Sequence, residues 1–236
     1  MTNCILASTS TIHNSTYLEY LFDAINELYK DTKEVLFIPY ARPSGISYKE
    51  YTSIAKKGFN KIGKKLIGIQ DFKDPIEAIQ KATGIFTGGG NTFVLVSTLY
   101  RKNLIQPLQD SILNGTPYLG TSAGSNIAGV SMKTTNDMPV VYTPSFKTLG
   151  IVPFNINAHY LDPDPNSTHK GETRETRIKE FHQFNKTPVI GLREGSWIRV
   201  QNDICILEGK SLTARIFEKD KVPYEVEPKT SLHYLK

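Results

Sequence analysis

The run Gly120-Thr121-Ser122-Ala123-Gly124 follows directly on the apolar segment Pro117-Tyr118-Leu119. A strand that turns sharply into a helix at a Gly-x-Ser-x-Gly sequence needs small residues on both sides of the serine. The turn holds the serine oxygen clear of the backbone, beside the free N–H groups of the helix start. This geometry suits an attacking hydroxyl, so we interpret Ser122 as a nucleophile. Glycine-rich turns also occur for packing alone. The interpretation of Ser122 as a nucleophile therefore needs a base, and a carboxylate that orients the base, elsewhere in the chain.

Histidine is the usual base for a serine hydroxyl near neutral pH. His159 ends an apolar segment and is expected at the rim of the core, where it could be either the base or a structural histidine. His13 lies in a loop after the first predicted strand and is the second candidate. His182 lies in the middle of a polar helix and is expected on a solvated face. His233 lies in the carboxyl-terminal tail, and His169 is the fifth histidine.

The base needs a carboxylate on its second ring nitrogen, which selects the tautomer and stabilises the imidazolium. Glu194 follows a predicted strand and precedes a glycine, and Asp137 and Asp162 are its rivals. Spacing alone does not choose among the three carboxylates.

The oxyanion of an attacked carbonyl could be held by two backbone N–H groups, that of Ala123 and one from Gly89 or Gly90. The triple glycine at 88–90 is followed by neither a Walker lysine nor a Gly-x-Gly-x-x-Gly pattern, which argues against a phosphate loop. No histidine pair has metal-ligand spacing and the cysteines are not clustered, so no metal and no cofactor are expected.

The elements that must position these residues alternate along the first half of the chain. Strands are predicted at 4–7, 35–38, 66–69, 85–87 and 117–119. Helices are predicted at 16–29, 51–62, 75–81, around residue 95 and around residue 108. The first of these helices is expected to begin with a capping box formed by Thr16 and Glu19. Continuously apolar strands separated by helices are typical of a mostly parallel sheet covered on both faces. Ligands bind beyond the carboxyl ends of such strands, where both Ser122 and the triple glycine are placed.

The second half of the chain reads differently. Thr173 is expected to cap a helix running to about Phe184, with Ile178 inward and Glu175 paired with Lys179. A short strand is predicted at 189–192. Antiparallel strands are predicted at 198–200, 204–207 and 214–217, with turns at 202–203 and 208–209.

Size and composition favour one soluble α/β domain spanning residues 1–236, with 39% hydrophobic and 22% charged residues. The net charge of +5 is spread without a basic tract, so no nucleic-acid partner is expected. Two distant cysteines, Cys4 and Cys205, indicate free thiols in a reducing compartment. The chain shows no signal peptide and no apolar run long enough to span a bilayer. A cytoplasmic protein without membrane association is expected.

Between about residues 84 and 200 the chain contains six distinctive blocks: Phe86-Thr87-Gly88-Gly89-Gly90-Asn91, Gly120-Thr121-Ser122-Ala123-Gly124, Thr134-Thr135-Asn136-Asp137-Met138-Pro139, Asn157-Ala158-His159, Lys170-Gly171-Glu172-Thr173-Arg174-Glu175 and Gly191-Leu192-Arg193-Glu194-Gly195. Together these blocks resemble the dipeptidase E (α-aspartyl dipeptidase) family of serine peptidases. The Asn-Asp-Met-Pro and Gly-Glu-Thr-Arg-Glu blocks are the most specific. Two departures are Ala158 in place of the family's usual proline and Ser125 in place of alanine.

The resemblance implies a flavodoxin-like three-layer α/β sandwich, related to class I glutamine amidotransferases, with antiparallel strands near the carboxyl terminus. It implies Ser122 as nucleophile, His159 as base and Glu194 as orienting carboxylate. Gly90 and Ala123 would donate to the oxyanion.

The substrates implied are dipeptides with amino-terminal aspartate. Arg174 would bind the aspartate side chain through two hydrogen bonds. The alternative for Arg174 is a structural role, as an arginine in the first turn of a helix that forms a salt bridge. Asp137 would contribute to substrate binding. Alternatives are a related hydrolase acting on β-aspartyl peptides and a non-catalytic small-molecule binding protein. A homo-oligomer is compatible with the sequence.

Overall fold

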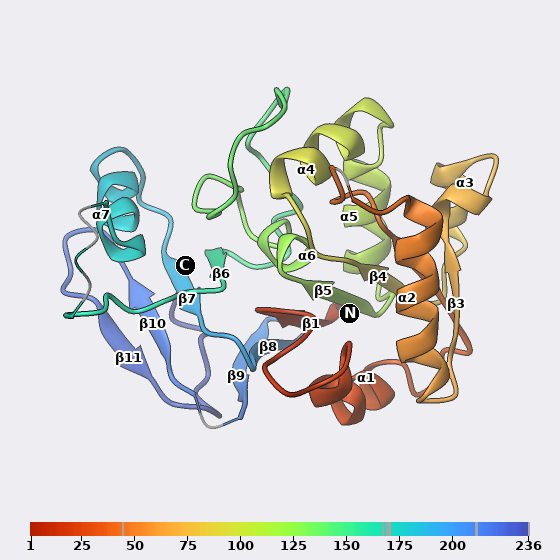
Figure 1. Cartoon of the computed structure of the whole chain (residues 1–236), viewed down its shortest axis with the longest axis horizontal. Helices are drawn as coiled ribbons and strands as arrows, with labels where there is room; N and C mark the ends of the chain where they lie inside the picture. Colours follow the sequence, from red (N-terminus) through yellow and green to blue (C-terminus); the bar gives the residue numbers. More distant parts are fainter. Residues whose placement is uncertain (44, 167, 169–170, 211, 236) are drawn as a thin grey trace.

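The computed structural model describes residues 1–43, 45–166, 168, 171–210 and 212–235, and its central layer is a seven-stranded sheet in the order β3-β2-β4-β5-β1-β8-β9 (Figure 1). The first five of these strands in the chain run parallel to one another. They are β1 (Asn3–Ala7), β2 (Glu34–Ile38), β3 (Lys65–Gly68), β4 (Ile85–Thr87) and β5 (Tyr118–Thr121). The expected mostly parallel sheet is therefore confirmed.

Helices cover both faces of this sheet. They are α1 (Phe22–Leu28), α2 (Tyr48–Asn60), α3 (Pro75–Gln80), α4 (Thr92–Arg101), α5 (Ile105–Leu113) and the short α6 (Ala123–Asn126). Successive residues of β1 point to opposite faces: Ile5 packs in a cluster with α1 and α2, and Leu6 in a cluster with α3, α4 and α5. Burial on both faces explains why these strands are continuously apolar.

A second sheet of four strands has the order β11-β10-β7-β6. It contains β6 (Asn155–Ala158), β7 (Val189–Leu192), β10 (Ala214–Phe217) and β11 (Tyr224–Val226), and α7 (Arg174–Phe184) packs against it through Ile178. The remaining strands, β8 (Ser196–Gln201) and β9 (Ile204–Gly209), extend the large sheet as an antiparallel hairpin. Antiparallel strands near the carboxyl terminus are confirmed, while their division between two sheets was not predicted. The single domain stays a prediction.

Three local expectations are corrected. Glu19 does reach back to the Thr16 N–H, at 2.7 Å, but a 3₁₀ turn follows and α1 begins only at Phe22. Residues 208–209 do not form a turn, because Gly209 is the last residue of β9. His182 is not on a solvated face: its side chain is buried and its Nε2 lies 3.0 Å from the carbonyl oxygen of Thr187.

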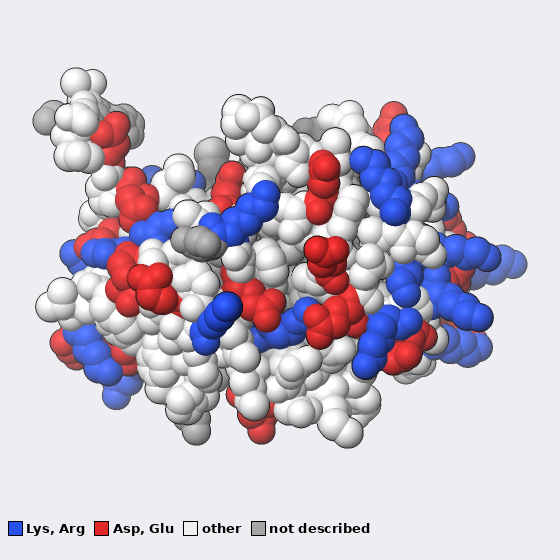
Figure 2. All heavy atoms as spheres, turned by 90° about the horizontal axis from the view of Figure 1, so that it is seen from below, with Lys and Arg blue, Asp and Glu red and all other residues white. Residues whose placement is uncertain are grey.

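The surface carries charges of both signs. On the face shown in Figure 2, acidic and basic side chains are interspersed over most of the surface. Among the described residues, no helix has the length and hydropathy needed to cross a membrane.

Candidate active site

Ser122 lies between β5, which ends at Thr121, and α6, which begins at Ala123. Its backbone has φ 53° and ψ −111°, a conformation that is unfavourable for a residue with a side chain, and its N–H donates to the Ala7 carbonyl at 3.0 Å. The flanking glycines are required sterically, because a Cβ on Gly120 would lie 2.5 Å from the Gly124 carbonyl oxygen. The strained turn lifts the Ser122 hydroxyl above the carboxyl edge of the sheet.

His159 and Glu194 stand beside this hydroxyl. The two residues follow the parallel strands β6 and β7, which end side by side with Ala158 opposite Leu192. His159 Nε2 lies 2.8 Å from Ser122 Oγ, and His159 Nδ1 lies 2.6 Å from Glu194 Oε1. An imidazole held between a hydroxyl and a carboxylate can accept the hydroxyl proton while its tautomer is selected by the carboxylate.

The other carboxylates and histidines are engaged or placed elsewhere. Asp162 forms an ion pair with Arg193 at 2.7 Å, and Asp137 accepts hydrogen bonds from Thr92. His13 and His233 are exposed, and among the described residues neither forms a hydrogen bond with Ser122, while His169 lies outside the described residues. Of the three carboxylates that the sequence left open, Glu194 is the one that contacts His159.

The triple-glycine turn lies against the nucleophile. A Cβ on Gly89 would lie 3.0 Å from Ser122 Cβ, and Gly90 has φ +141°, with the space for its Cβ 2.2 Å from the Ala41 carbonyl oxygen. Only glycine fits at Gly90, because both the dihedral angle and the space exclude a side chain. The contacts among the described residues include no acceptor for the N–H of Gly90 or of Ala123, so both are available to an incoming oxygen.

Ser8 is a site residue that the sequence reasoning missed. Its buried hydroxyl accepts the His159 N–H at 2.9 Å and donates to the Leu192 carbonyl at 2.7 Å. The preceding Ala7 carbonyl accepts both the Ser122 N–H and, at 2.6 Å, the Ser125 hydroxyl. The end of β1 therefore holds the segments that carry Ser122, His159 and Glu194. The only sequence signal for the role of Ser8 is its position directly after an apolar strand.

Asp137 supports the start of α4. Its Oδ2 accepts the backbone N–H of Thr92 at 2.7 Å, the Thr92 hydroxyl at 2.6 Å and the Thr135 hydroxyl at 3.0 Å. The adjacent Asn136 donates its amide to the Ala158 carbonyl at 2.8 Å. The Asn-Asp-Met-Pro block thus connects the helix after the triple glycine with the segment before His159, and the contacts of Asp137 are those of a supporting residue.

Arg174 is the first residue of α7 and its side chain is half-buried. Its Nη1 is buried without a hydrogen-bond partner among the described residues. Desolvation lowers the pKa of Arg174, and the nearby carboxylate of Glu194 opposes this shift. A guanidinium nitrogen without an acceptor beside Glu194 is suited to bind an anionic substrate group. The alternative role, a salt bridge to a protein carboxylate, is not observed for Arg174 among the described residues.

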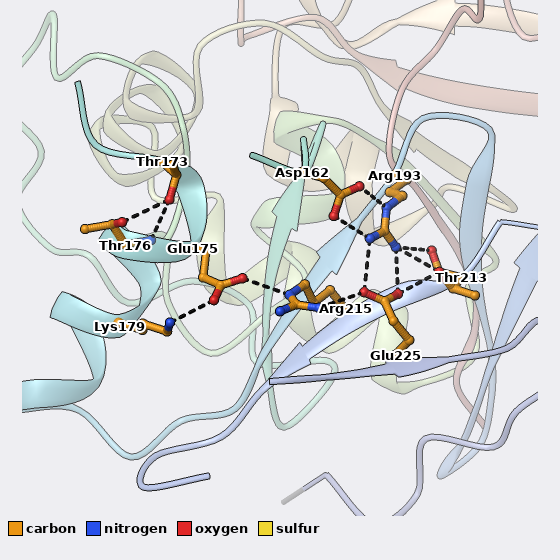
Figure 3. Close-up of polar contacts among 9 residues, drawn as sticks. All are labelled: Asp162, Thr173, Glu175, Thr176, Lys179, Arg193, Thr213, Arg215 and Glu225. Atoms are coloured by element: carbon orange, nitrogen blue, oxygen red, sulfur yellow. Dashed lines mark hydrogen bonds and ion pairs between the residues drawn. The ribbon is translucent and has the colours of Figure 1, made fainter. Parts of the chain in front are cut away.

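A network of ion pairs includes Glu175 and Arg193, the chain neighbours of Arg174 and Glu194 (Figure 3). Arg193 bonds Asp162 and Glu225, Arg215 bonds Glu225 and Glu175, and Glu175 bonds Lys179 as the sequence predicted. Desolvation would raise the pKa of Glu225, but its hydrogen bonds to Arg193, Thr213 and Arg215 outweigh burial and lower it to about 2. The network connects α7 with β7, β10 and β11, and so holds the start of α7 near Glu194.

The described residues contain no group of three or more His, Cys, Asp or Glu side chains arranged to hold a metal ion. The site as described consists of a hydroxyl, an imidazole, a carboxylate, two N–H donors and a guanidinium.

Comparisons with known proteins agree with this architecture. The model of peptidase family S51 matches residues 4–207. A Streptomyces coelicolor protein named Peptidase E is 45% identical over 224 residues, which are 95% of this chain and 90% of that protein. A Drosophila melanogaster protein named "Probable alpha-aspartyl dipeptidase" is 43% identical over 236 residues, 99% of this chain and 97% of that protein. The crystal structure of a peptidase from an acI-B1 actinobacterium has a TM-score of 0.67 at 17% identity, covering 98% of this chain and 96% of the other, and supports the fold alone.

Proposed function

We propose that this chain, which belongs to peptidase family S51 and is a serine-type dipeptidase, hydrolyses dipeptides whose first residue is aspartate. The observation that carries the proposal is the position of His159, within hydrogen-bond distance of Ser122 Oγ on one side and Glu194 Oε1 on the other. An arrangement of this kind is what nucleophilic catalysis by a hydroxyl requires. The name of the Drosophila relative supports the aspartyl preference.

In the proposed mechanism, His159 removes the Ser122 proton as the hydroxyl oxygen attacks the peptide carbonyl. The oxyanion receives hydrogen bonds from the N–H groups of Gly90 and Ala123. The tetrahedral intermediate collapses, the C–N bond breaks and His159 passes its proton to the leaving amine. Water then attacks the acyl-enzyme by the same route, which releases aspartate and restores Ser122. Glu194 stabilises the imidazolium in both halves.

Arg174 is proposed to select the aspartate side chain. Its unpartnered Nη1 and its position beside Glu194 support this role. A guanidinium can bind a carboxylate through two parallel hydrogen bonds, which favours aspartate over a neutral residue of similar size. A cytoplasmic location belongs to the same proposal, because Cys4 and Cys205 are buried free thiols.

The first experiment measures hydrolysis of Asp-Leu and of Ala-Leu by the purified protein, with Ser122→Ala as the control. We expect Asp-Leu to be cleaved much faster than Ala-Leu, and kcat for Asp-Leu to fall by roughly 10⁴-fold or more in the variant. Near-wild-type activity of Ser122→Ala would exclude the nucleophile role. Binding of Asp-Leu without turnover would identify a binding protein, and cleavage of β-linked but not α-linked Asp-Leu would identify a different hydrolase.

Substituting Arg174 by Gln tests the specificity. We expect kcat/KM for Asp-Leu to fall by roughly 10²-fold, because a charge-assisted bidentate contact is lost. The residual activity on Ala-Leu should be unaffected by the substitution. Equal losses on both dipeptides would mean that Arg174 does not contact the aspartate side chain.

A further inference from the structure

A second group of polar side chains lies at the same edge of the sheet, on the side of α2. Arg42 follows β2, Tyr51 belongs to α2 and Tyr17 precedes α1. The guanidinium carbon of Arg42 lies 4.3 Å from the centroid of the Tyr51 ring. None of these residues has a role in the mechanism described above.

All three side chains carry buried donors without partners. Arg42 Nε, Tyr51 Oη and Tyr17 Oη have no hydrogen-bond partner among the described residues, and the Tyr51 side chain is only 1% exposed. Desolvation raises the pKa of Tyr17 well above its usual range, the neighbouring Tyr51 hydroxyl raises it further and the charge of Arg42 opposes the shift. The Tyr17 hydroxyl therefore keeps its proton and can donate. Buried donors are costly unless an acceptor binds them, and an acceptor with several lone pairs would satisfy all three.

Tyr51 lies against the triple-glycine turn, and the same turn lies against Ser122. A Cβ on Gly88 would lie 2.5 Å from Tyr51 Oη, and a Cβ on the next residue, Gly89, would lie 3.0 Å from Ser122 Cβ. The carbonyl of Ala41, the residue before Arg42, accepts the Asn91 N–H at 2.7 Å. The positions beside Tyr51 and beside Ser122 therefore belong to successive residues of one turn, Gly88 and Gly89.

We propose that Arg42, Tyr51 and Tyr17 form a subsite for the α-carboxylate of the second residue of the dipeptide. The inference rests on the proposed function. In a dipeptide this carboxylate belongs to the residue that directly follows the scissile bond, and Tyr51 and Ser122 lie beside successive residues of the glycine turn. A guanidinium with two hydroxyl donors matches a carboxylate, which only accepts hydrogen bonds.

The subsite gives the two carboxylates of Asp-X separate cationic partners. Arg174 comes from α7 and Arg42 from beside α2, and Figure 1 shows these helices on opposite sides of α6, whose first residue follows Ser122. In a longer peptide the terminal carboxylate lies at least one residue, about 3.5 Å, further from the scissile bond. Binding at the subsite therefore favours dipeptides over longer peptides.

The test compares kcat/KM for Asp-Leu with kcat/KM for Asp-Leu amide, which lacks the carboxylate. We expect the wild-type protein to favour the free acid by roughly 10- to 100-fold, the range for a charge-assisted hydrogen bond. Arg42→Gln should bring this ratio close to one, and Tyr51→Phe should lower it. Arg101→Gln is the matched control and should retain the wild-type ratio. Arg101 lies in the last turn of α4, and its hydrogen bonds within the described part of the chain go to Ser97 and Thr98.

Tyr51→Phe separates binding from folding, because the Tyr51 hydroxyl forms no hydrogen bond with any described residue. Its thermal unfolding should match that of the wild type. The subsite is overturned if the wild-type protein cleaves acid and amide equally well, or if both Arg42→Gln and Tyr51→Phe keep the wild-type ratio. In either case Ser122-dependent cleavage of Asp-Leu still supports the proposed function, whereas absence of any such cleavage would refute the function itself.

Discussion

At the scale of single residues, Ser8 connects the strands that carry His159 and Glu194. Ser8→Ala removes the acceptor of the His159 N–H and the donor to the Leu192 carbonyl. We expect kcat for Asp-Leu to fall about 10- to 100-fold with a small change in KM, because His159 is displaced from Ser122 rather than removed from the substrate. The free energy of unfolding should fall by about 1–3 kcal/mol.

Thr148→Ala is the matched control for Ser8. The Thr148 hydroxyl is also buried and donates to the Gly129 carbonyl at 2.7 Å, but within the described part of the chain it forms no hydrogen bond with Ser122, His159 or Glu194. We expect a comparable loss of stability without the fall in kcat. If both variants lost kcat equally, Ser8 would act only through global stability. Urea unfolding and steady-state kinetics at one temperature make the comparison.

At the scale of elements, the carboxylate of Asp137 binds the amino terminus of α4. Asp137→Ala leaves the backbone N–H of Thr92 without its carboxylate acceptor and removes a negative charge from the start of the helix. We expect the free energy of unfolding to fall by about 1–2 kcal/mol with little change in KM for Asp-Leu. A raised KM without loss of stability would instead indicate a direct substrate contact, as the sequence comparison with the family suggested.

Asp74→Ala is the matched control for Asp137→Ala, because it also removes a carboxylate that caps a helix, here α3. The Asp74 carboxylate caps α3 by accepting the N–H groups of Ile76 and Glu77, at 2.9 and 3.1 Å. Its replacement should destabilise the protein to a similar degree and leave both kcat and KM unchanged. Activity lost in Asp137→Ala but retained in Asp74→Ala would therefore arise from the start of α4 next to the triple glycine.

At the scale of the whole molecule, the ion-pair network predicts how stability depends on pH. Hydrogen bonds from Arg193, Thr213 and Arg215 lower the pKa of folded Glu225 to about 2, and Arg193 lowers the pKa of Asp162. A carboxylate with a depressed folded pKa stabilises the protein above its unfolded pKa, about 4, and this contribution is lost as pH falls toward 2. Thermal unfolding between pH 7 and pH 2.5 should show Tm falling below about pH 4.5.

Glu225→Gln should reduce the fall of Tm at acidic pH, because the substitution removes one of the titrating carboxylates. Glu77→Gln removes the partner of Lys81 from an exposed pair on α3 and serves as the control. We expect Glu225→Gln to have a lower Tm at pH 7 and a weaker dependence of Tm on pH, while Glu77→Gln follows the wild type. Identical pH profiles for all three proteins would show that the network does not control acid stability.

Much of the fold follows from local patterns in the chain. The strand at Ile85–Thr87, the strand at Val189–Leu192 and the helix capped by Thr173 occur where the sequence predicts them. Apolar runs and capping residues act over a few neighbours, so they can be recognised without tertiary information. The family resemblance read from the sequence motifs is confirmed as well.

Other features depended on which distant segments meet. Local pattern could not separate β10, which joins the second sheet through β7, from β8 and β9, which extend the first. His182 was misassigned because the sequence does not reveal that the carbonyl of Thr187 folds back to it. Burial of a polar side chain is decided by partners that the sequence does not place.

By itself, the sequence determined the chemistry available at the edge of the sheet: a serine in a strained turn, a glycine turn, and several histidines and carboxylates after strands. Only the tertiary structure decided which of them meet. The pairing of β6 with β7 brings His159 to Glu194 and leaves Asp162 with Arg193, and the fold also brings Ser8 and Arg42 to the same edge. Strand and helix formation depend on neighbours in the chain, whereas a site depends on how strands are ordered and paired across the whole molecule.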